Sequence, residues 1–196
     1  MRLRHAVLAA LSLHLSAVAL GAQATLRAAP SGRATSEVAL EYPRGAAPAG
    51  AQAMSIKVEY GQPHLRGRAI NTDSLVPFGT PWRTGANNAT TLTTGVDLTV
   101  GGQPVPQGTY VVWTLPTRTG WTLILQKSAA PAGTQAVTPY DSANDVARIA
   151  LRQQTLATPI ESLTMWLIPA RDASPARGEL RLAWGTTQLS TDWVVR

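Results

Sequence analysis

The chain has 196 residues, of which only 14% are charged, and a formal net charge of +6 at pH 7. This length is enough for one domain with a substantial core but is short for two. There is no cysteine and no run of lysine or arginine, which excludes disulfides, thiol catalysis and thiolate metal sites and argues against nucleic-acid binding.

The first 24 residues have the pattern of a cleaved signal peptide. Arg2 and Arg4 form a basic start, residues 6–20 are apolar, and Ala22-Gln23-Ala24 supplies a small-x-small cleavage site. A transmembrane anchor needs about 20 apolar residues, and this run is shorter and interrupted by polar residues. We therefore expect an exported protein, periplasmic or secreted, with no stable membrane span after cleavage.

Residues 25–52 are rich in alanine, proline, glycine and arginine and show no sustained period. This composition predicts a flexible linker or an irregular lead-in, in which residues 38–42 pair at the edge of a sheet. A single domain is expected to follow over residues 53–196.

Alternating apolar and polar residues predict strands throughout this domain. The alternation starts after Ala53, and Gly101-Gly102-Gln103 predicts a tight hairpin turn. Residues 128–142 are expected to form a loop, followed by no more than one helical turn over 141–145. The predicted strands cover residues 54–60, 90–94, 96–100, 110–115, 121–125, 145–152, 163–168, 180–184 and 189–195.

About nine short strands separated by turn residues, with no long amphipathic helix, are typical of an all-β protein. The sequence therefore predicts an antiparallel β-sandwich of jelly-roll or Ig-like form. Large aromatic side chains fill the space between packed sheets. We expect four tryptophans in this core: Trp113, Trp121, Trp166 and Trp184.

The stretch Tyr60–Thr91 is irregular and rich in polar side chains, in contrast to the regular strands around it. His64, the only histidine outside the signal peptide, has the chemistry of a general base or a metal ligand. It has no second histidine and no carboxylate at ligand spacing, and no Gly-x-Ser-x-Gly motif is present. No metal, cofactor or catalytic residue is therefore assigned, and an exposed loop histidine is the favoured interpretation.

Two arginines of this stretch are stronger candidates for recognition. Arg68 follows a turn glycine, and Arg83 follows Trp82, an aromatic side chain that can anchor it. Such a pair suits a carboxylate, a phosphate or a sugar ring. The alternative is structural, because arginine also bonds loop carbonyls. Asn87 and Thr90 likewise suit either a polar ligand or a tie between two loops.

Several short motifs together carry a resemblance to a known family. They are Tyr60-Gly61-Gln62-Pro63, Gly67-Arg68, Leu75-Val76-Pro77-Phe78-Gly79, Trp82-Arg83-Thr84-Gly85-Ala86-Asn87, Ala89-Thr90-Thr91, Pro106-Gln107-Gly108-Thr109-Tyr110, Trp121-Thr122, Tyr140-Asp141 and Asp145-Val146. Together they resemble a bacterial family of exported domains known as domain of unknown function 2911, over about residues 52–196. The resemblance implies an exported β-domain without an established activity. Asn88 stands where the family often has an acidic residue.

The preferred hypothesis is a binding module of the bacterial cell envelope, which recognises a small molecule, a glycan or an envelope protein. Its recognition surface would lie on the 60–91 loops and comprise Tyr60, His64, Arg68, Trp82, Arg83, Asn87 and Thr90. The alternative is a hydrolase or lyase that acts on an envelope polymer through His64 or a carboxylate. A third possibility is that the motifs only lock the loops of the fold.

Overall fold

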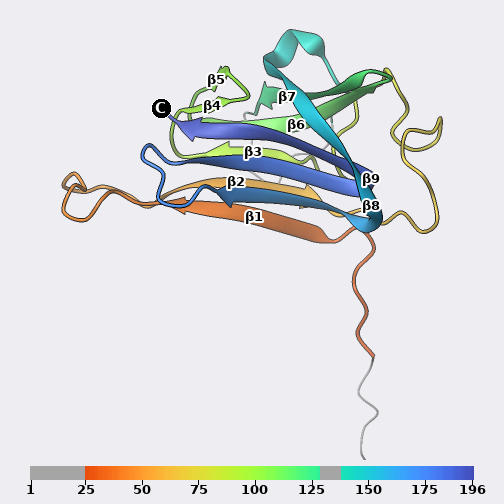
Figure 1. The fold of residues 1–196 in the computed structure, drawn as a ribbon, viewed down its shortest axis with the longest axis horizontal. Helices are drawn as coiled ribbons and strands as arrows, with labels where there is room; N and C mark the ends of the chain where they lie inside the picture. Colours follow the sequence, from red (N-terminus) through yellow and green to blue (C-terminus); the bar gives the residue numbers. More distant parts are fainter. Residues whose placement is uncertain (1–24, 129–137) are drawn as a thin grey trace, which may run out of the picture.

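The computed structural model describes residues 25–128 and 138–196 (Figure 1). The expected signal peptide, residues 1–24, lies outside the described residues, as does most of the loop expected after residue 128. No helix in the described part of the chain is long and apolar enough to span a membrane.

Nine strands and one turn of 3-10 helix, η1 (Ser142–Asn144), form the secondary structure of the described residues. The helical turn falls where the sequence predicts it. The strands are β1 (Arg33–Leu40), β2 (Met54–Gly61), β3 (Thr91–Thr94), β4 (Leu98–Val100), β5 (Gln103–Val105), β6 (Gly108–Thr117), β7 (Gly120–Lys127), β8 (Asp145–Pro169) and β9 (Arg177–Val195).

All nine strands belong to one antiparallel sheet in the order β1-β2-β3-β6-β7-β8-β9-β4-β5, which is not closed into a barrel. The all-β class, the antiparallel pairing and the number of strands are therefore confirmed. Because the strands are connected in one continuous sheet, the jelly-roll or Ig-like form stays a prediction.

β8 is one long strand where the sequence predicts two. Its first part pairs with β7, with Trp121 opposite Leu151, and its later part pairs with β9. The register to β9 shifts around Ile160, which marks a bend. Residues in this bend are mostly exposed and do not alternate between apolar and polar. The sequence therefore predicts two separate strands on either side of it.

β9 likewise combines two predicted strands. Gly185 has a φ of +61°, in the left-handed region that glycine adopts without strain, and the chain reverses there. The Val195 N–H donates to the Ala176 carbonyl at 2.8 Å, so the start and the end of β9 lie side by side. We call residues 177–184 and 187–195 the two arms of β9; they run next to each other in blue in Figure 1.

The bent sheet encloses one apolar core, and hydroxyl groups link its distant parts. The Met165 N–H of β8 donates to the Tyr60 hydroxyl at 2.9 Å, and the Leu167 N–H donates to Ser36 Oγ at 2.8 Å. These bonds give hydrogen-bond partners to two backbone N–H groups on the edge of β8 that faces away from β9. The residues of β1 and β2 thus cover a sheet edge that would otherwise leave buried donors unpaired.

The segment 25–52, expected to be a linker or an irregular lead-in, contains β1. β1 pairs with β2 along its whole length, from Arg33 opposite Gly61 to Leu40 opposite Met54. It starts earlier than the edge pairing expected at residues 38–42. Of its core-facing residues only Val38 is large and fully buried, because Ala34 and Ser36 are small. This weak apolar signal explains why composition pointed to a linker.

The tryptophan predictions are correct in part. Trp121 and Trp184 lie in the main core. Trp113 is buried outside that cluster, where its ring meets Tyr140 edge-on at 5.5 Å. Trp166 is only partly buried, so its assignment to the core is wrong. On β8 the core-facing positions are odd-numbered, as at Met165, and the alternation therefore turns Trp166 outward.

A polar cluster fixes the start of β8. One Asp145 oxygen accepts the Gln126 amide at 2.9 Å, and the other accepts the Tyr140 hydroxyl at 2.7 Å and the Arg148 guanidinium at 2.6 Å. Burial by itself would raise the pKa of Asp145, but these hydrogen bonds and the charge of Arg148 outweigh it and lower the pKa below the ordinary aspartate value. The carboxylate is thus stabilised in its charged form by the fold.

Replacing Asp145 by asparagine is expected to lower the free energy of unfolding at pH 7 by about 1–3 kcal/mol, the range for hydrogen bonds to a charged group. Because the folded-state pKa is lowered, the stabilisation is present above about pH 4 and is lost as the pH falls through the folded-state pKa. Urea unfolding between pH 2 and pH 7 measures both effects. Asp192→Asn, at an exposed ion pair with Arg152, is the control and should cost less than about 1 kcal/mol. An equal loss in both variants would contradict the prediction.

Candidate functional site

Two glycines of the 60–91 stretch lie where one backbone segment closely approaches another. A Cβ atom on Gly61 would lie 1.9 Å from the Ala86 carbonyl oxygen, and one on Gly85 would lie 2.7 Å from Thr90 Oγ1. Thr90 is fully buried and donates its hydroxyl to the Thr84 carbonyl at 2.9 Å. Gly61 and the 84–90 loop are therefore locked together, and Thr90 has a structural role.

Asn87 holds this loop to the segment before β1. Its side-chain amide donates to the Ser31 carbonyl at 2.9 Å, while its backbone adopts a φ of 61°. Asparagine tolerates this left-handed conformation better than most residues. The contact corresponds to the loop tie that was one of the two interpretations of Asn87.

Left-handed backbone is concentrated in the same stretch. Among the described residues, seven non-glycine residues have a positive φ, and five of them lie between residues 60 and 91. Val76 and Thr84 are β-branched, for which such a φ is unusual. Both are almost fully buried, so the surrounding packing holds them in place. Strain of this kind occurs at functional sites and also in tightly locked loops.

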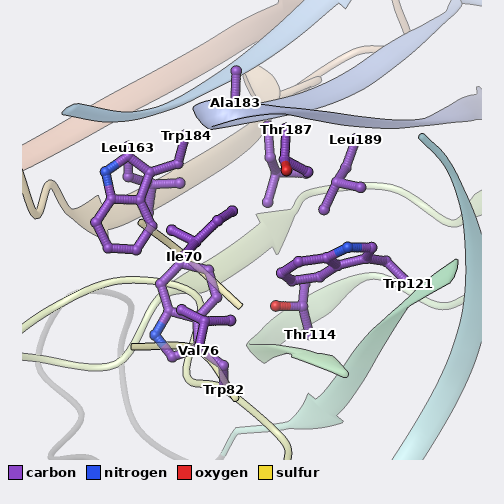
Figure 2. A pocket seen from close by; sticks show the side chains of 11 residues that line it. Ile70, Val76, Trp82, Thr114, Trp121, Leu163, Ala183, Trp184, Thr187 and Leu189 are labelled. Atoms are coloured by element: carbon purple, nitrogen blue, oxygen red, sulfur yellow. The ribbon is translucent and has the colours of Figure 1, made fainter. Parts of the chain in front are cut away.

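Trp82 is directed into the core rather than toward solvent. Its backbone pairs with Thr114, and its ring stacks on Trp184 with centroids 5.5 Å apart and planes 15° apart. Figure 2 shows both rings, together with Trp121, around a small cavity. The cavity has a volume of about 20 Å³, room for about one water molecule, and an apolar lining. Trp82 is partly buried and anchors its loop through these contacts, and its role in ligand binding stays a prediction.

Tyr60 and Arg83 have opposite surroundings. Tyr60 is 2% exposed, and burial raises the pKa of its hydroxyl, which accepts the Met165 N–H. Arg83 is partly exposed, and within residues 25–128 and 138–196 no side chain or carbonyl forms a hydrogen bond or ion pair with its guanidinium. Tyr60 is therefore part of the core, while the N–H groups of the Arg83 guanidinium can donate to a ligand or another partner.

His64 contacts a residue that the sequence did not single out. Its Nδ1 lies 2.5 Å from Ser162 Oγ, and the two residues face each other across an isolated antiparallel bridge. On either side, the Leu65 N–H donates to the Glu161 carbonyl at 2.8 Å and the Leu163 N–H to the Pro63 carbonyl at 2.9 Å. The chain after β2 is therefore fastened to β8, and His64 lies at the centre of this junction.

Arg68 closes the next turn. Its Nε donates to the Leu65 carbonyl at 2.9 Å, and one terminal nitrogen donates to the His64 carbonyl at 2.9 Å. The Arg66 N–H donates to a Glu161 carboxylate oxygen at 2.8 Å. A guanidinium has five N–H donors, so these two bonds hold Arg68 in one place and leave further donors for another group.

Arg68 and Glu161 both line a groove at this end of the sheet, where the loop after β2, the bend of β8 and the turn of β9 meet. We call it the end groove. Its volume is about 360 Å³, within the range of small-molecule sites. Its lining consists of Leu65, Gly67, Arg68, Ala69, Ile70, Pro159, Glu161, Gly185 and Thr186.

Of the seven candidate residues, the end groove includes one. Arg68 lines it, and the His64 carbonyl accepts a hydrogen bond from Arg68. The other five do not line it: Tyr60, Trp82, Asn87 and Thr90 make the internal contacts described above, and Arg83 is partly exposed. The other wall comes from Pro159, Glu161 and the Gly185-Thr186 turn, almost a hundred residues away in the sequence. Only the proline and glycine carried a signal, since both mark chain reversals.

No group of three or more His, Asp or Glu side chains gathers at a metal-binding distance in the described residues. The chemistry available in the end groove is hydrogen bonding and charge: guanidinium donors on one wall and carboxylate acceptors on the other.

Comparison with known proteins identifies a family. A search of curated proteins and a search of solved structures each find no match. A family model described as "Protein of unknown function (DUF2911)" matches residues 43–192, which include every residue that lines the end groove. This match confirms the resemblance found in the sequence motifs. The chain therefore belongs to the DUF2911 family of proteins of unknown function.

Proposed function

We propose that this protein is an exported binding module of the bacterial cell envelope, with the end groove as its ligand site. The observation that carries the proposal is the position of Arg68, which two carbonyl bonds hold in a groove of about 360 Å³. An arginine fixed before the ligand arrives loses little side-chain entropy on binding. The basic and apolar start of the sequence supports export.

The two charged groups of the end groove indicate the ligand class. The free N–H groups of Arg68 suit a carboxylate or phosphate, and the Glu161 carboxylate suits an ammonium or hydroxyl group. Apart from Thr186, the remaining lining is apolar or glycine, which suits a compact molecule rather than a long polymer. We expect a small polar ligand that carries both an acidic group and a hydrogen-bond donor.

Replacing Arg68 by alanine is expected to weaken binding of such a ligand at least tenfold, because a charge-assisted hydrogen bond contributes about 1.5–3 kcal/mol. Residues 25–196 would be titrated with glutamate, Ala-Ala dipeptide and glycerol phosphate, with chemical shifts followed by NMR. The matched control is Arg171→Ala, an arginine whose side chain is 94% exposed and far along the chain.

Two outcomes would contradict the proposal. One is that none of the three probes shifts resonances of residues 65–70 or 185–186. The other is that Arg68→Ala binds a probe as tightly as the unaltered protein does. Thermal unfolding of each variant verifies that the comparison is between folded proteins.

A second candidate, a hydrolase acting on an envelope polymer, is favoured by one observation: His64 Nδ1 lies 2.5 Å from Ser162 Oγ. This is the distance at which a histidine can activate a serine nucleophile. No carboxylate of residues 25–128 or 138–196 bonds to the ring, so the orienting third member of a triad is missing there. Covalent labelling of Ser162 by a fluorophosphonate, abolished by His64→Ala, would favour the hydrolase.

A further inference from the structure

A second, wider groove lies on the outer face of β8 and the two arms of β9, and its lining shares no residue with the end groove. It consists of two adjoining hollows of about 520 and 320 Å³ that share Glu179 and Arg181. We call it the face groove. Its polar lining includes Arg152, Gln154, Glu179, Arg181, Gln188 and Asp192.

The strand register places these side chains in rows. Arg152 of β8 is opposite Ser190 of β9, and Gln154 is opposite Gln188. Arg152 also reaches Glu179 on the other arm, at 3.6 Å. Because side chains of directly opposed residues lie on the same face, the groove crosses three neighbouring stretches of strand.

Within the face groove the charges are already paired, except for that of Arg177. Arg152 donates two hydrogen bonds to the two Asp192 oxygens, both at 2.8 Å, and Arg181 Nε donates to Glu179 at 2.6 Å. The hydrogen bonds from Arg152 lower the pKa of Asp192, which therefore stays ionised at neutral pH. The Gln188 amide donates to the Gln154 carbonyl oxygen at 3.0 Å. The lining is thus held in a fixed pattern of donors and acceptors.

This pairing selects against a strongly charged ligand. A polyanion would compete with Asp192 and Glu179 for the guanidinium groups, and Arg177 is the one cation of the lining without an acidic partner in the described residues. A hydroxyl group is both donor and acceptor, so neighbouring hydroxyls can bond a guanidinium and a carboxylate without separating them. The partly exposed side chains, 27% for Glu179 and 37% for Arg181, leave such positions accessible.

One aromatic ring next to the face groove adds an apolar component. Trp166, which the alternation turns outward, is opposite Arg181 in the β8–β9 register and is partly exposed. Trp193 lies beneath the groove, but it is 1% exposed and belongs to the core. A ligand with apolar faces and polar edges matches an exposed ring beside paired ions.

From these observations we infer that the face groove binds a neutral glycan chain. Sugar rings have the required alternation of C–H faces and hydroxyl edges, and the groove is long enough to span three neighbouring strand stretches. The site is separate from the end groove, so a protein with both would hold a small polar ligand at one end and a polysaccharide along one face.

The test uses residues 25–196 and three neutral oligosaccharides, cellohexaose, maltohexaose and chitohexaose, with polygalacturonate as the acidic comparison. NMR titration is expected to show shifts on β8 and β9 with at least one neutral hexasaccharide. Arg181→Ala should weaken that binding at least tenfold, since it removes charge-assisted hydrogen bonds. Affinity should be the same at about 50 and about 300 mM salt, because no net charge is neutralised.

The controls separate this inference from the proposed function. Arg68→Ala, in the end groove, should bind the oligosaccharide unchanged, and failure of the small-ligand titration would leave the face groove result standing. The inference is overturned if no neutral oligosaccharide shifts β8 or β9, if Arg181→Ala binds as well as the unaltered protein, or if polygalacturonate alone binds with a steep salt dependence. Thermal unfolding of Arg181→Ala, together with the milder Arg181→Gln, excludes loss of folding as the cause.

Discussion

Replacing Gly61 by alanine is expected to destabilise the protein by about 3 kcal/mol or more, a large fraction of the stability of a domain of this size. The added Cβ would lie 1.9 Å from the Ala86 carbonyl oxygen and 2.7 Å from its carbon. Both atoms are backbone, and the loop that carries them is fastened by buried Thr90. Neither side can move without breaking these bonds, so the whole 84–90 loop would be displaced.

Urea unfolding of Gly61→Ala and of Gly120→Ala measures this effect against a matched control. Gly120 opens β7, and a Cβ atom there would meet nothing within 4 Å. Its replacement should be neutral or stabilise by a few tenths to about 1 kcal/mol through the unfolded state. A Gly61→Ala protein with unchanged stability would show that the close contact between β2 and the 84–90 loop is not needed.

Replacing Trp184 by alanine is expected to cost about 3–5 kcal/mol, the range for removing a large aromatic side chain from a core. Trp184 is 4% exposed, stacks on Trp82, and donates its indole N–H to the Glu161 carbonyl at 3.2 Å. Its loss would enlarge the small cavity beside it and release the backbone of Glu161. We therefore expect weaker binding in the end groove as well as lower stability.

Trp166→Ala is the matched control for this prediction, because Trp166 lies on the outer face of β8. It should cost less than about 1 kcal/mol, as expected for a partly exposed side chain. Guanidinium unfolding followed by circular dichroism compares the two variants. Equal losses would mean that Trp166 is packed as tightly as Trp184 and would contradict the prediction.

The strands were predictable where one face is apolar. Ile56 and Val58 of β2 alternate with polar residues, and the Gly101-Gly102 turn has the chemistry of a hairpin, so both were located from the sequence. Only the end of β1 was predicted, as an edge pairing at residues 38–42, because Ala34 and Ser36 face the core without adding apolar bulk. Residue types alone also could not show that β8 and β9 each continue through a bend.

The candidate site was predictable as a region but not as a set of contacts. Thr90 and Asn87 were predicted either to bind a ligand or to tie two loops together, and the structure shows both in loop contacts. Gly61 was quoted only as part of a motif, and its close approach to Ala86 is seen only in the structure. Arg68 is the one predicted residue that lines the end groove. Glu161 and Ser162 were not assigned to the site, since an acid and a serine within a strand are ordinary residues until a partner is known.

The sequence by itself determined the all-β class, the position of the irregular stretch and the family, because strand periodicity and turn residues are local properties of the chain. Only the tertiary structure decided what that stretch does. Trp82 turns inward because Trp184 is there to stack on it, and Arg68 lines a groove because the bend of β8 and the turn at Gly185 form the opposite wall. Such contacts join residues about a hundred positions apart. The alternation of apolar and polar residues within one segment cannot predict which distant strand will lie opposite a loop.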